Sequence, residues 1–257
     1  MLNFRVAVAS TEQEIRDAQR VRFRVYVDEE RMLARRAGAE ELDSDERDFC
    51  PYTTHVLVYR RGEPVGTVRL LRPRTSPDAD LGRLDLDLDL SSNFRLSGFA
   101  REGLRLGEVT RFCVLRSHRG SSAAALLFSA LCRESVRHSI THWVAAANTQ
   151  TDDAEDAEVL SQIVVKKSLG SPEFAARPLT TAVSREPTRR IYSAEEVRLA
   201  RAGRCESLEL PPVLSLFARR MGALYIGPPA YDAHFNVFAM PLVSRVRDCT
   251  SVAHCSH

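Results

Sequence analysis

The sequence has no long hydrophobic run. A helix needs about 18 consecutive apolar residues to cross a bilayer, and no stretch of this chain reaches that length. The first five residues, Met1 to Arg5, lack the apolar core of a secretory signal peptide. We therefore expect a cytoplasmic protein without a transmembrane segment.

Paired cysteines are missing as well. Six cysteines occur without any Cys-x-x-Cys spacing, and Cys113 and Cys132 lie in apolar segments where a free thiol packs as a small hydrophobe. This usage suits a reducing compartment. Metal-ligating residues gather at the end of the chain, at Cys249, His254, Cys255 and His257. The polar composition there predicts a disordered tail over residues 244–257 rather than a zinc site, so we expect no metal.

Neither sign of charge dominates. The formal net charge is +2, which argues against a nucleic-acid-binding protein. Lysine occurs only at positions 166 and 167, while arginines crowd the first helical region at Arg16, Arg20, Arg22, Arg24, Arg31, Arg35 and Arg36. Genome composition accounts for much of this imbalance, but an arginine-dense surface also suits an acidic partner. The four-residue spacing of Arg20 with Arg24, repeated by Arg31 with Arg35, predicts a common helical face.

The composition predicts one domain. With 44% apolar residues the chain can bury a large core, and no domain-scale linker interrupts it. We expect an α/β fold over residues 1–243, with a mixed central sheet flanked by helices. Residues 148–209 form a partly helical insertion that could cover the site.

Local patterns predict the individual elements. Strands are expected over residues 4–9, 54–59, 65–71, 107–115, 142–147, 223–226 and 235–242. The second and third of these are expected to form a hairpin around residues 60–63. Helices are expected after the capping box at Thr11, from 121 to 131, from 151–156 through 165, near 194–201, and from Pro212 to Gly222. The segment 73–106 is expected to be irregular, with its Asp-Leu alternation over 84–90 at an edge or turn.

The most informative segment is Gly107–Gly120. Its first half predicts a buried strand, in which Glu108 and Arg111 are costly charges unless they are paired or used in chemistry. Its second half predicts an Arg-Gly turn before a helix, and free N–H groups at such a turn bind phosphate. The anion site would consist of Arg119, Gly120, Ser121 and Ser122. A Glu–Arg pair before an ordinary helix is the alternative.

This strand–turn–helix resembles the core of the GNAT acyltransferases, although Ser121-Ser122 stand where that family has a second glycine. A wider set of positions is similar to the acyl-homoserine-lactone synthases and the N-acyl amino acid synthases. These positions are Arg22, Val25, Tyr26, Asp45, Asp48, Val68 to Leu71, Glu108, Arg111 and Phe112. The segment 214–242 resembles the ornithine N-acyltransferases of the same group. Met32 stands about where lactone synthases carry a tryptophan, which points away from lactone formation.

The resemblance implies a GNAT-like fold and an N-acyltransferase activity. We expect transfer of a fatty acyl group from acyl carrier protein, or from acyl-CoA, to the amine of an amino acid, with no tightly bound cofactor. The alternatives are an acyl-homoserine-lactone (autoinducer) synthase, an ornithine-lipid N-acyltransferase and, in another class, a catalytically silent domain that binds an acyl group or its carrier. The expected partners are the carrier protein and a small amine, without nucleic acid. A peripheral membrane contact through the lipid product stays open.

Candidate roles combine this resemblance with the chemistry of amide formation. Glu108 is the candidate proton acceptor, because burial would raise its pKa, although Arg111 would lower it. By position in the family, the main chain of Phe112 and Cys113 would stabilise the oxyanion. The acceptor-binding group would be Arg22, Tyr26, Asp45, Asp48, Arg69 and Arg111. The alternative for these charges is an ion-pair network that stiffens the loop 40–53.

Cys113 offers a second mechanism, in which the acyl group passes through a thioester on the protein. A nucleophilic cysteine needs a nearby histidine or helix N-terminus, and the closest histidine in sequence, His118, lies on the phosphate-side turn. We therefore favour Cys113 as a buried core residue. His55 and His234 are expected to be structural.

Overall fold

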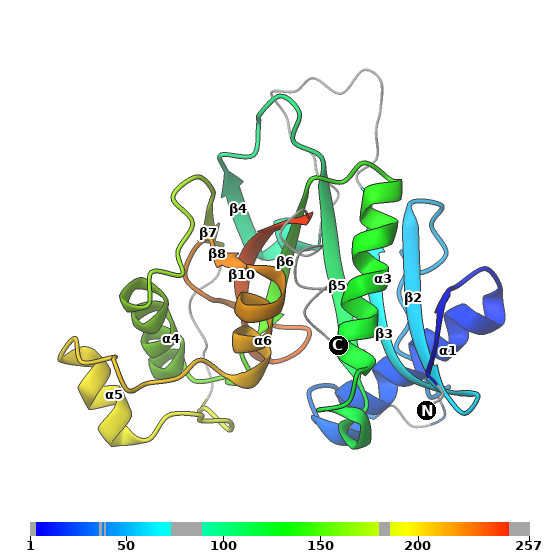
Figure 1. Ribbon diagram of the computed structural model, residues 1–257. Helices are drawn as coiled ribbons and strands as arrows, with labels where there is room; N and C mark the ends of the chain where they lie inside the picture. Colours follow the sequence, from blue (N-terminus) through cyan, green and yellow to red (C-terminus); the bar gives the residue numbers. More distant parts are fainter. Residues whose placement is uncertain (1–3, 36–37, 39, 73–88, 180–185, 247–257) are drawn as a thin grey trace.

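Eight strands form one mixed sheet (Figure 1). The computed structural model describes residues 4–35, 38, 40–72, 89–179 and 186–246. The strand order is β1-β2-β3-β5-β6-β10-β8, with β9 paired to β10. The bounds are β1 (Phe4–Val8), β2 (Thr53–Arg60), β3 (Glu63–Leu71), β5 (Leu106–Val114), β6 (His142–Asn148), β8 (Leu224–Tyr225), β9 (Ala230–Asp232) and β10 (Val237–Arg245). The expected mixed α/β architecture is confirmed.

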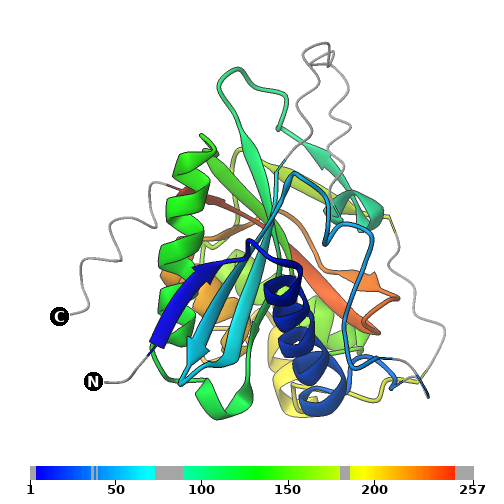
Figure 2. The ribbon, with the colours of Figure 1, turned by 90° about the vertical axis from the view of Figure 1, so that its right-hand side faces the viewer.

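Helices cover both faces of the first half of the sheet. Helices α1 (Glu12–Phe23) and α3 (Ala123–Arg137) lie on opposite sides of it (Figure 2). Val56 and Val58 of β2 belong to the main core with residues of α3, whereas Leu57 and Tyr59 pack with Ala18 of α1. Because both faces are covered, β2 is a continuous apolar run instead of an alternating one.

The first helix ends earlier than the spacing of its arginines predicts. Thr11 caps α1 as expected, with its side chain accepting from the N–H of Glu14. After α1 the chain continues as a π-helical turn, η1 (Arg24–Glu29), and Arg31 has a positive φ of 53°. The expected helical spacing of Arg31 and Arg35 is therefore wrong, because the helix has ended before either residue.

The hairpin between β2 and β3 is confirmed. Its two turn residues, Arg61 and Gly62, both have positive φ, at 54° and 89°. This is the backbone of a type I′ turn, whose twist matches that of the flanking strands.

The middle of the sheet opens between β5 and β6. These two strands are joined through α3 and run parallel, as such a crossover requires. Their pairing covers Leu106 to Glu108 against His142 to Val144. Beyond Glu108, β5 continues for six residues along β3 alone within the described pairing. Phe112 and Cys113, the residues expected to stabilise the oxyanion, lie within this stretch of β5 that is not paired with β6, which we call the splay.

The second half of the chain adds further helices and a small sheet. Helices α4 (Ala154–Lys166), α5 (Ala194–Arg201) and α6 (Pro212–Met221) confirm the expected helices, and α4 and α5 make the 148–209 insertion partly helical. Short strands β4 (Phe94–Ser97) and β7 (Ala175–Pro178) pair with each other, so the expectation that 73–106 is irregular is wrong at β4, and β7 was not expected. The short helix α2 (Leu90–Asn93) precedes β4.

Several expectations concern residues at or beyond the edges of the described part of the chain. Most of the Asp-Leu alternation over 84–90 and the terminal cysteines and histidines lie outside them. Strand β10 runs to Arg245, slightly past the expected domain end at 243. No helix in the described part of the chain is long and apolar enough to cross a membrane.

Candidate active site

A network of arginines and aspartates is buried between α1 and the sheet. Arg22 comes from α1, Arg69 from β3 and Arg111 from β5. The aspartates come from the loop that follows η1, and they are Asp43, Asp45 and Asp48. This loop is the acidic segment 40–48, which is irregular as expected.

Arg22 is fully buried and is saturated by the loop. Its Nη1 and Nη2 lie 2.9 and 2.5 Å from the two carboxylate oxygens of Asp48. Its Nε lies 3.0 Å from Oδ2 of Asp43. A two-fold contact of this kind is the geometry that arginine makes best with a carboxylate.

Arg69 is equally buried and joins four segments. Its Nη1 lies 2.6 and 2.7 Å from the oxygens of Asp45 and 2.9 Å from Oδ1 of Asp48. Its Nε donates to Oγ1 of Thr110 on β5 at 2.9 Å, and its Nη2 lies 3.2 Å from Asp89.

The charges of this network are fixed at neutral pH. Burial alone would raise the pKa of Asp48, but hydrogen bonds and charge from Arg22 hold that pKa well below its ordinary range. At Asp45, burial is likewise outweighed by Arg69, and the pKa is lowered. Neither aspartate can therefore exchange protons near pH 7, so their role is electrostatic.

Arg111 is the member of the network with spare capacity. Its Nε and Nη2 lie 3.2 Å from Oδ2 of Asp43 and Oδ2 of Asp45, and its guanidinium stacks 5.0 Å from the ring centre of Phe235. Arg111 Nε and Asp43 Oδ2 are buried and form an ion pair with each other, and Oδ2 also lies 3.0 Å from Arg22 Nε, but neither atom makes a hydrogen bond among the described residues. Buried polar atoms are rarely left in this state unless they serve a ligand or a water.

A β-bulge in β5 places Arg111. Arg69 pairs with Thr110 and Thr67 pairs with Cys113, so two residues of β5 stand opposite Val68. Arg111 has a φ of 55° in this bulge, a left-handed conformation that is uncommon for a residue other than glycine. Bulges re-aim side chains next to functional sites.

Glu108 lies on the same strand but does not pair with Arg111. It is almost completely buried, and its two oxygens accept from the backbone N–H groups of Asp89 at 2.7 Å and Leu90 at 2.8 Å. Burial, with the charge of Asp89, raises the pKa of Glu108 to about 8. The simple Glu–Arg pair weighed from the sequence is therefore wrong, because each side chain has other partners.

Cys113 is buried against Tyr26. Burial raises the pKa of the Cys113 thiol to about 12, even though the Tyr26 hydroxyl donates to it. A thiol with that pKa is not a nucleophile at neutral pH, which favours Cys113 as a core residue. The ring of Tyr26 packs 4.8 Å from that of Phe235, the same ring that Arg111 covers.

The expected phosphate turn lies at the other end of β5. A 3-10 turn, η2 (Arg116–His118), leads through Gly120, which has a φ of 83°, into α3. Ser122 is the first cap residue of α3 and makes no capping hydrogen bond, while Ser121 Oγ accepts from Ala123. The N–H groups of Ser121 and Ala123 are thus bonded within the turn, to the backbone oxygen of His118 and to Ser121 Oγ, and an anion at this helix start would use the neighbouring N–H groups.

The structure brings most of the predicted residues together. Glu108 and the acceptor group, Arg22, Tyr26, Asp45, Asp48, Arg69 and Arg111, surround the start of the splay, and Arg119 to Ser122 lie beyond its far end. Sequence reasoning missed Asp43 and Asp89, which contact this group from the acidic loop and from the end of the Asp-Leu alternation. His55 is structural as expected, with Nε2 lying 2.9 Å from the backbone oxygen of Asp48.

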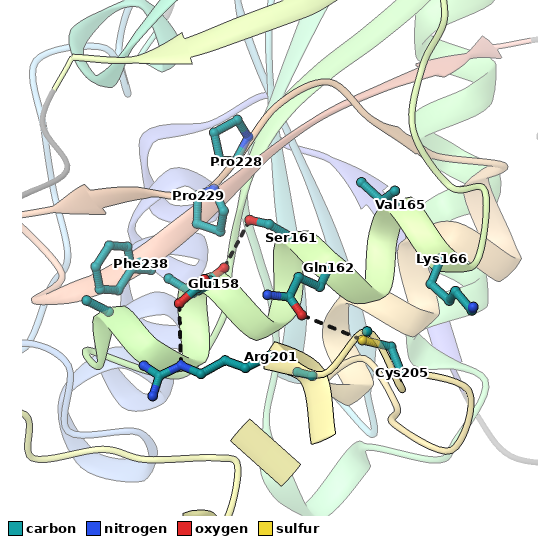
Figure 3. A pocket seen from close by; sticks show the side chains of 14 residues that line it. Glu158, Ser161, Gln162, Val165, Lys166, Arg201, Cys205, Pro228, Pro229 and Phe238 are labelled. Atoms are coloured by element: carbon teal, nitrogen blue, oxygen red, sulfur yellow. Dashed lines mark hydrogen bonds and ion pairs between the residues drawn. The ribbon is translucent and has the colours of Figure 1, made fainter. Parts of the chain in front are cut away.

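Two surface cavities flank this region. The larger, of about 730 Å³, lies between α4, the end of α5 and Pro228-Pro229, and no predicted site residue lines it (Figure 3). The second, of about 630 Å³, is lined by Val27, Asp28, residues 31–35, Thr188, Arg189 and Asn236. It adjoins the network because Asn236 follows Phe235, the ring in contact with Arg111 and Tyr26.

Comparison with protein families finds one matching domain model. The Acetyltransferase (GNAT) domain matches residues 21–129, from α1 into α3. Two curated relatives, both L-ornithine N(alpha)-acyltransferases, are similar in sequence. The protein from Rhodobacter capsulatus is 31% identical over 147 residues, covering 54% of each chain. The protein from Brucella abortus is 35% identical over 146 residues, covering 52% of this chain and 49% of its own. The chain thus spans about half the length of the relatives it matches.

Solved structures agree on the fold. FeeM, an N-acyl amino acid synthase from uncultured soil microbes, aligns with a TM-score of 0.51 and 13% identity, over 98% of this chain and 94% of its own. BjaI, a CoA-dependent acyl-homoserine lactone synthase, aligns with a TM-score of 0.53 and 15% identity, over 98% and 88%. At these identities the likeness extends to the fold alone.

Proposed function

We propose that this chain, a GNAT acyltransferase related to the ornithine N-acyltransferases, transfers a fatty acyl group from a phosphopantetheine thioester to the α-amino group of ornithine. One observation carries the proposal, which is the order of three features along β5. The polar network comes first, at Glu108–Arg111, the splay next, at Phe112 and Cys113, and the anion turn last, at Arg119–Ser122. A donor lying along this strand, with its phosphate at the turn, would bring its thioester to the splay beside the network.

Ornithine is favoured over other amino acids by the sequence relatives. From the sequence, transfer to a free amino acid came first and ornithine was an alternative. The similarity to two L-ornithine N(alpha)-acyltransferases supports that alternative better, although it covers about half of the chain.

The reaction needs an amine in its neutral form and a stabilised oxyanion. The amine nitrogen attacks the thioester carbon, the new C–N bond forms, the C–S bond breaks, and the thiol leaves with a proton. Backbone N–H groups of β5 within the splay would stabilise the oxyanion. Glu108 is the proposed proton acceptor, since a pKa of about 8 suits proton uptake near neutral pH.

Arg111 and Asp43, on the side of the network with fewer hydrogen bonds, would bind the acceptor. Arg111 can form paired hydrogen bonds with an α-carboxylate, and Asp43 can accept from an ammonium group. Both side chains have a buried atom that makes no hydrogen bond among the described residues. Arg22 and Asp48 saturate each other and would position the loop.

For the donor, we favour acyl carrier protein over coenzyme A. The turn has a single glycine, Gly120, and the carrier presents one phosphate where coenzyme A presents three. Arg24 and Arg31 are exposed just after the C-terminal end of α1, where they could face an acidic carrier.

Mass spectrometry of purified reactions tests the proposal. Acyl carrier protein or coenzyme A, each charged with the same acyl chain, would be incubated with ornithine, lysine, glutamate or S-adenosylmethionine. We expect acylated ornithine as the main product. Nα-acetylornithine, in which the α-amine is blocked, serves as the matched control and should give none.

Other products would contradict the proposal in distinct ways. A lactone from S-adenosylmethionine would make the chain an autoinducer synthase, and acylation of Nα-acetylornithine would move the reaction to the side-chain amine. Absence of product from every acceptor, with the acyl carrier still bound, would identify a silent binding domain.

A further inference from the structure

Two glutamates of the chain contact the edge of the turn assigned to the donor phosphate, at the backbone of Arg116 and at the side chain of Arg119. Both oxygens of Glu29 accept from the backbone N–H of Arg116, at 3.0 and 2.9 Å. Glu30 lies 2.7 Å from Nη1 of Arg119, and Glu29 lies 3.3 Å from its Nη2. An internal carboxylate thus uses the kind of donors, backbone N–H and guanidinium, that a phosphate would use.

The π-helical turn η1 delivers these carboxylates. Glu29 is its last residue, and the N–H of Glu30 donates to the backbone oxygen of Val25 at 2.9 Å, the five-residue step of a π-helix. Figure 1 shows the end of α1 beside the turn that leads into α3. The two glutamate side chains are each 18% exposed, so they are held against the turn and do not project into solvent.

We propose that Glu29 and Glu30 form an internal anion that the donor phosphate must displace, and that they thereby set the donor specificity of the enzyme. The inference rests on the proposed function in one respect only, the use of a phosphopantetheine donor. The guanidinium of Arg119 cannot pair fully with Glu29 and Glu30 and with a donor phosphate at the same time. Displaced carboxylates stay close by, so each additional phosphate on the donor meets further repulsion.

This repulsion favours a donor with one phosphate over a donor with three. The opposite role is that of a brace, in which the glutamates hold the two arginines in position for the phosphate. The two roles predict opposite changes in the affinity for the donor. Removing the carboxylate charge tightens donor binding if the glutamates compete, and weakens it if they brace.

The test is calorimetric binding of coenzyme A and of free 4′-phosphopantetheine to the full chain. Glu29→Gln and Glu30→Gln each keep a side-chain oxygen as acceptor and remove the charge. We expect the Kd for coenzyme A to fall at least 5-fold in the double variant, and the Kd for 4′-phosphopantetheine to fall less. Glu12→Gln, an exposed position at the other end of α1, makes the same charge change away from the turn and should alter neither Kd.

Binding is measured without turnover, which separates this inference from the proposed function. Tighter binding in the variants supports the competing role even if ornithine proves not to be the acceptor. An unchanged or raised Kd in variants that keep the wild-type Tm overturns it. It is equally overturned if neither compound binds the wild type or the variants, because the turn is then not the donor site.

Discussion

Replacing Glu108 with glutamine should show how its raised pKa couples folding to pH. Burial, with the charge of Asp89, raises the pKa of this carboxyl from 4.5 to about 8 in the folded protein. The unfolded chain titrates near the ordinary value, so the folded protein holds an additional proton between these two pH values. The contribution of Glu108 to stability is therefore complete at low pH and is lost as the pH rises through about 8.

The size of the effect follows from the two pKa values. Their difference corresponds to about 5 kcal/mol, at about 1.4 kcal/mol per pH unit. The Glu108→Gln variant cannot ionise, but its amide offers one acceptor to the two N–H groups of Asp89 and Leu90. Leaving one buried N–H unpaired costs about 1–3 kcal/mol at every pH. We expect the variant to be less stable than wild type at pH 5 and more stable at pH 9.

Urea unfolding between pH 5 and 9 measures this difference. Glu102→Gln, at an exposed position just before β5, is the control and should differ from wild type by a constant amount. A constant difference for Glu108→Gln would refute the reasoning. It would mean that Glu108 is already ionised at pH 5, with its two N–H partners outweighing its burial.

The same variant tests the proposed proton acceptor. If Glu108 accepts the proton, wild-type turnover should rise with pH through about 8, and Glu108→Gln should lower it by about 10²-fold or more. If the variant keeps a turnover close to wild type and an unchanged pH profile, Glu108 is not the proton acceptor. Its role is then structural, through its contacts to Asp89 and Leu90.

Further outcomes are expected from substitutions of Asp48 and Arg111 in the network and of Cys113 beside it. Asp48→Asn removes a buried charge between two arginines and should cost about 3–5 kcal/mol in urea unfolding, whereas the exposed Asp28→Asn should cost at most about 1 kcal/mol. Because the pKa of Asp48 is lowered, its contribution is present above pH 4 or so and is lost on acidification, which an acid titration of both variants would show. Arg111→Lys keeps the charge without the forked donors, so the KM for ornithine should rise about 10-fold, by steady-state kinetics. Cys113→Ala should keep turnover within about 3-fold, and a loss of about 10³-fold or more would revive the acyl-cysteine route.

The elements that the sequence predicted best are those with local signals. The hairpin around Arg61-Gly62 and the first helix α1 follow from turn and capping residues, and both begin where they were expected. Such signals act within a few residues and do not depend on the rest of the fold.

The features that escaped prediction depend on distant partners. Strands β4 and β7 are four residues each and pair across about 80 positions of sequence, so neither segment shows a pattern alone. The bulge at Arg111 needs a left-handed residue, and arginine carries no preference that would reveal it. Asp43 and Asp89 join the network through tertiary contacts that no spacing in the acidic loop or the Asp-Leu segment encodes.

The two interpretations of the charged residues, acceptor binding and a stiffening network, need not compete, because the structure separates the residues that would serve each. Arg22 and Asp48 bond each other at 2.5 and 2.9 Å in a fully buried position, and neither has room for a substrate. Arg111 lies over the ring of Phe235 and pairs with Asp43 through two buried atoms that make no hydrogen bond among the described residues. Substitutions of Arg22 or Asp48, which only hold the loop, should affect folding. Substitutions of Arg111 or Asp43, which would bind the acceptor, should affect the KM. If Arg111→Lys lowers stability as much as Asp48→Asn and leaves the KM unchanged, this division is wrong and the whole network is structural.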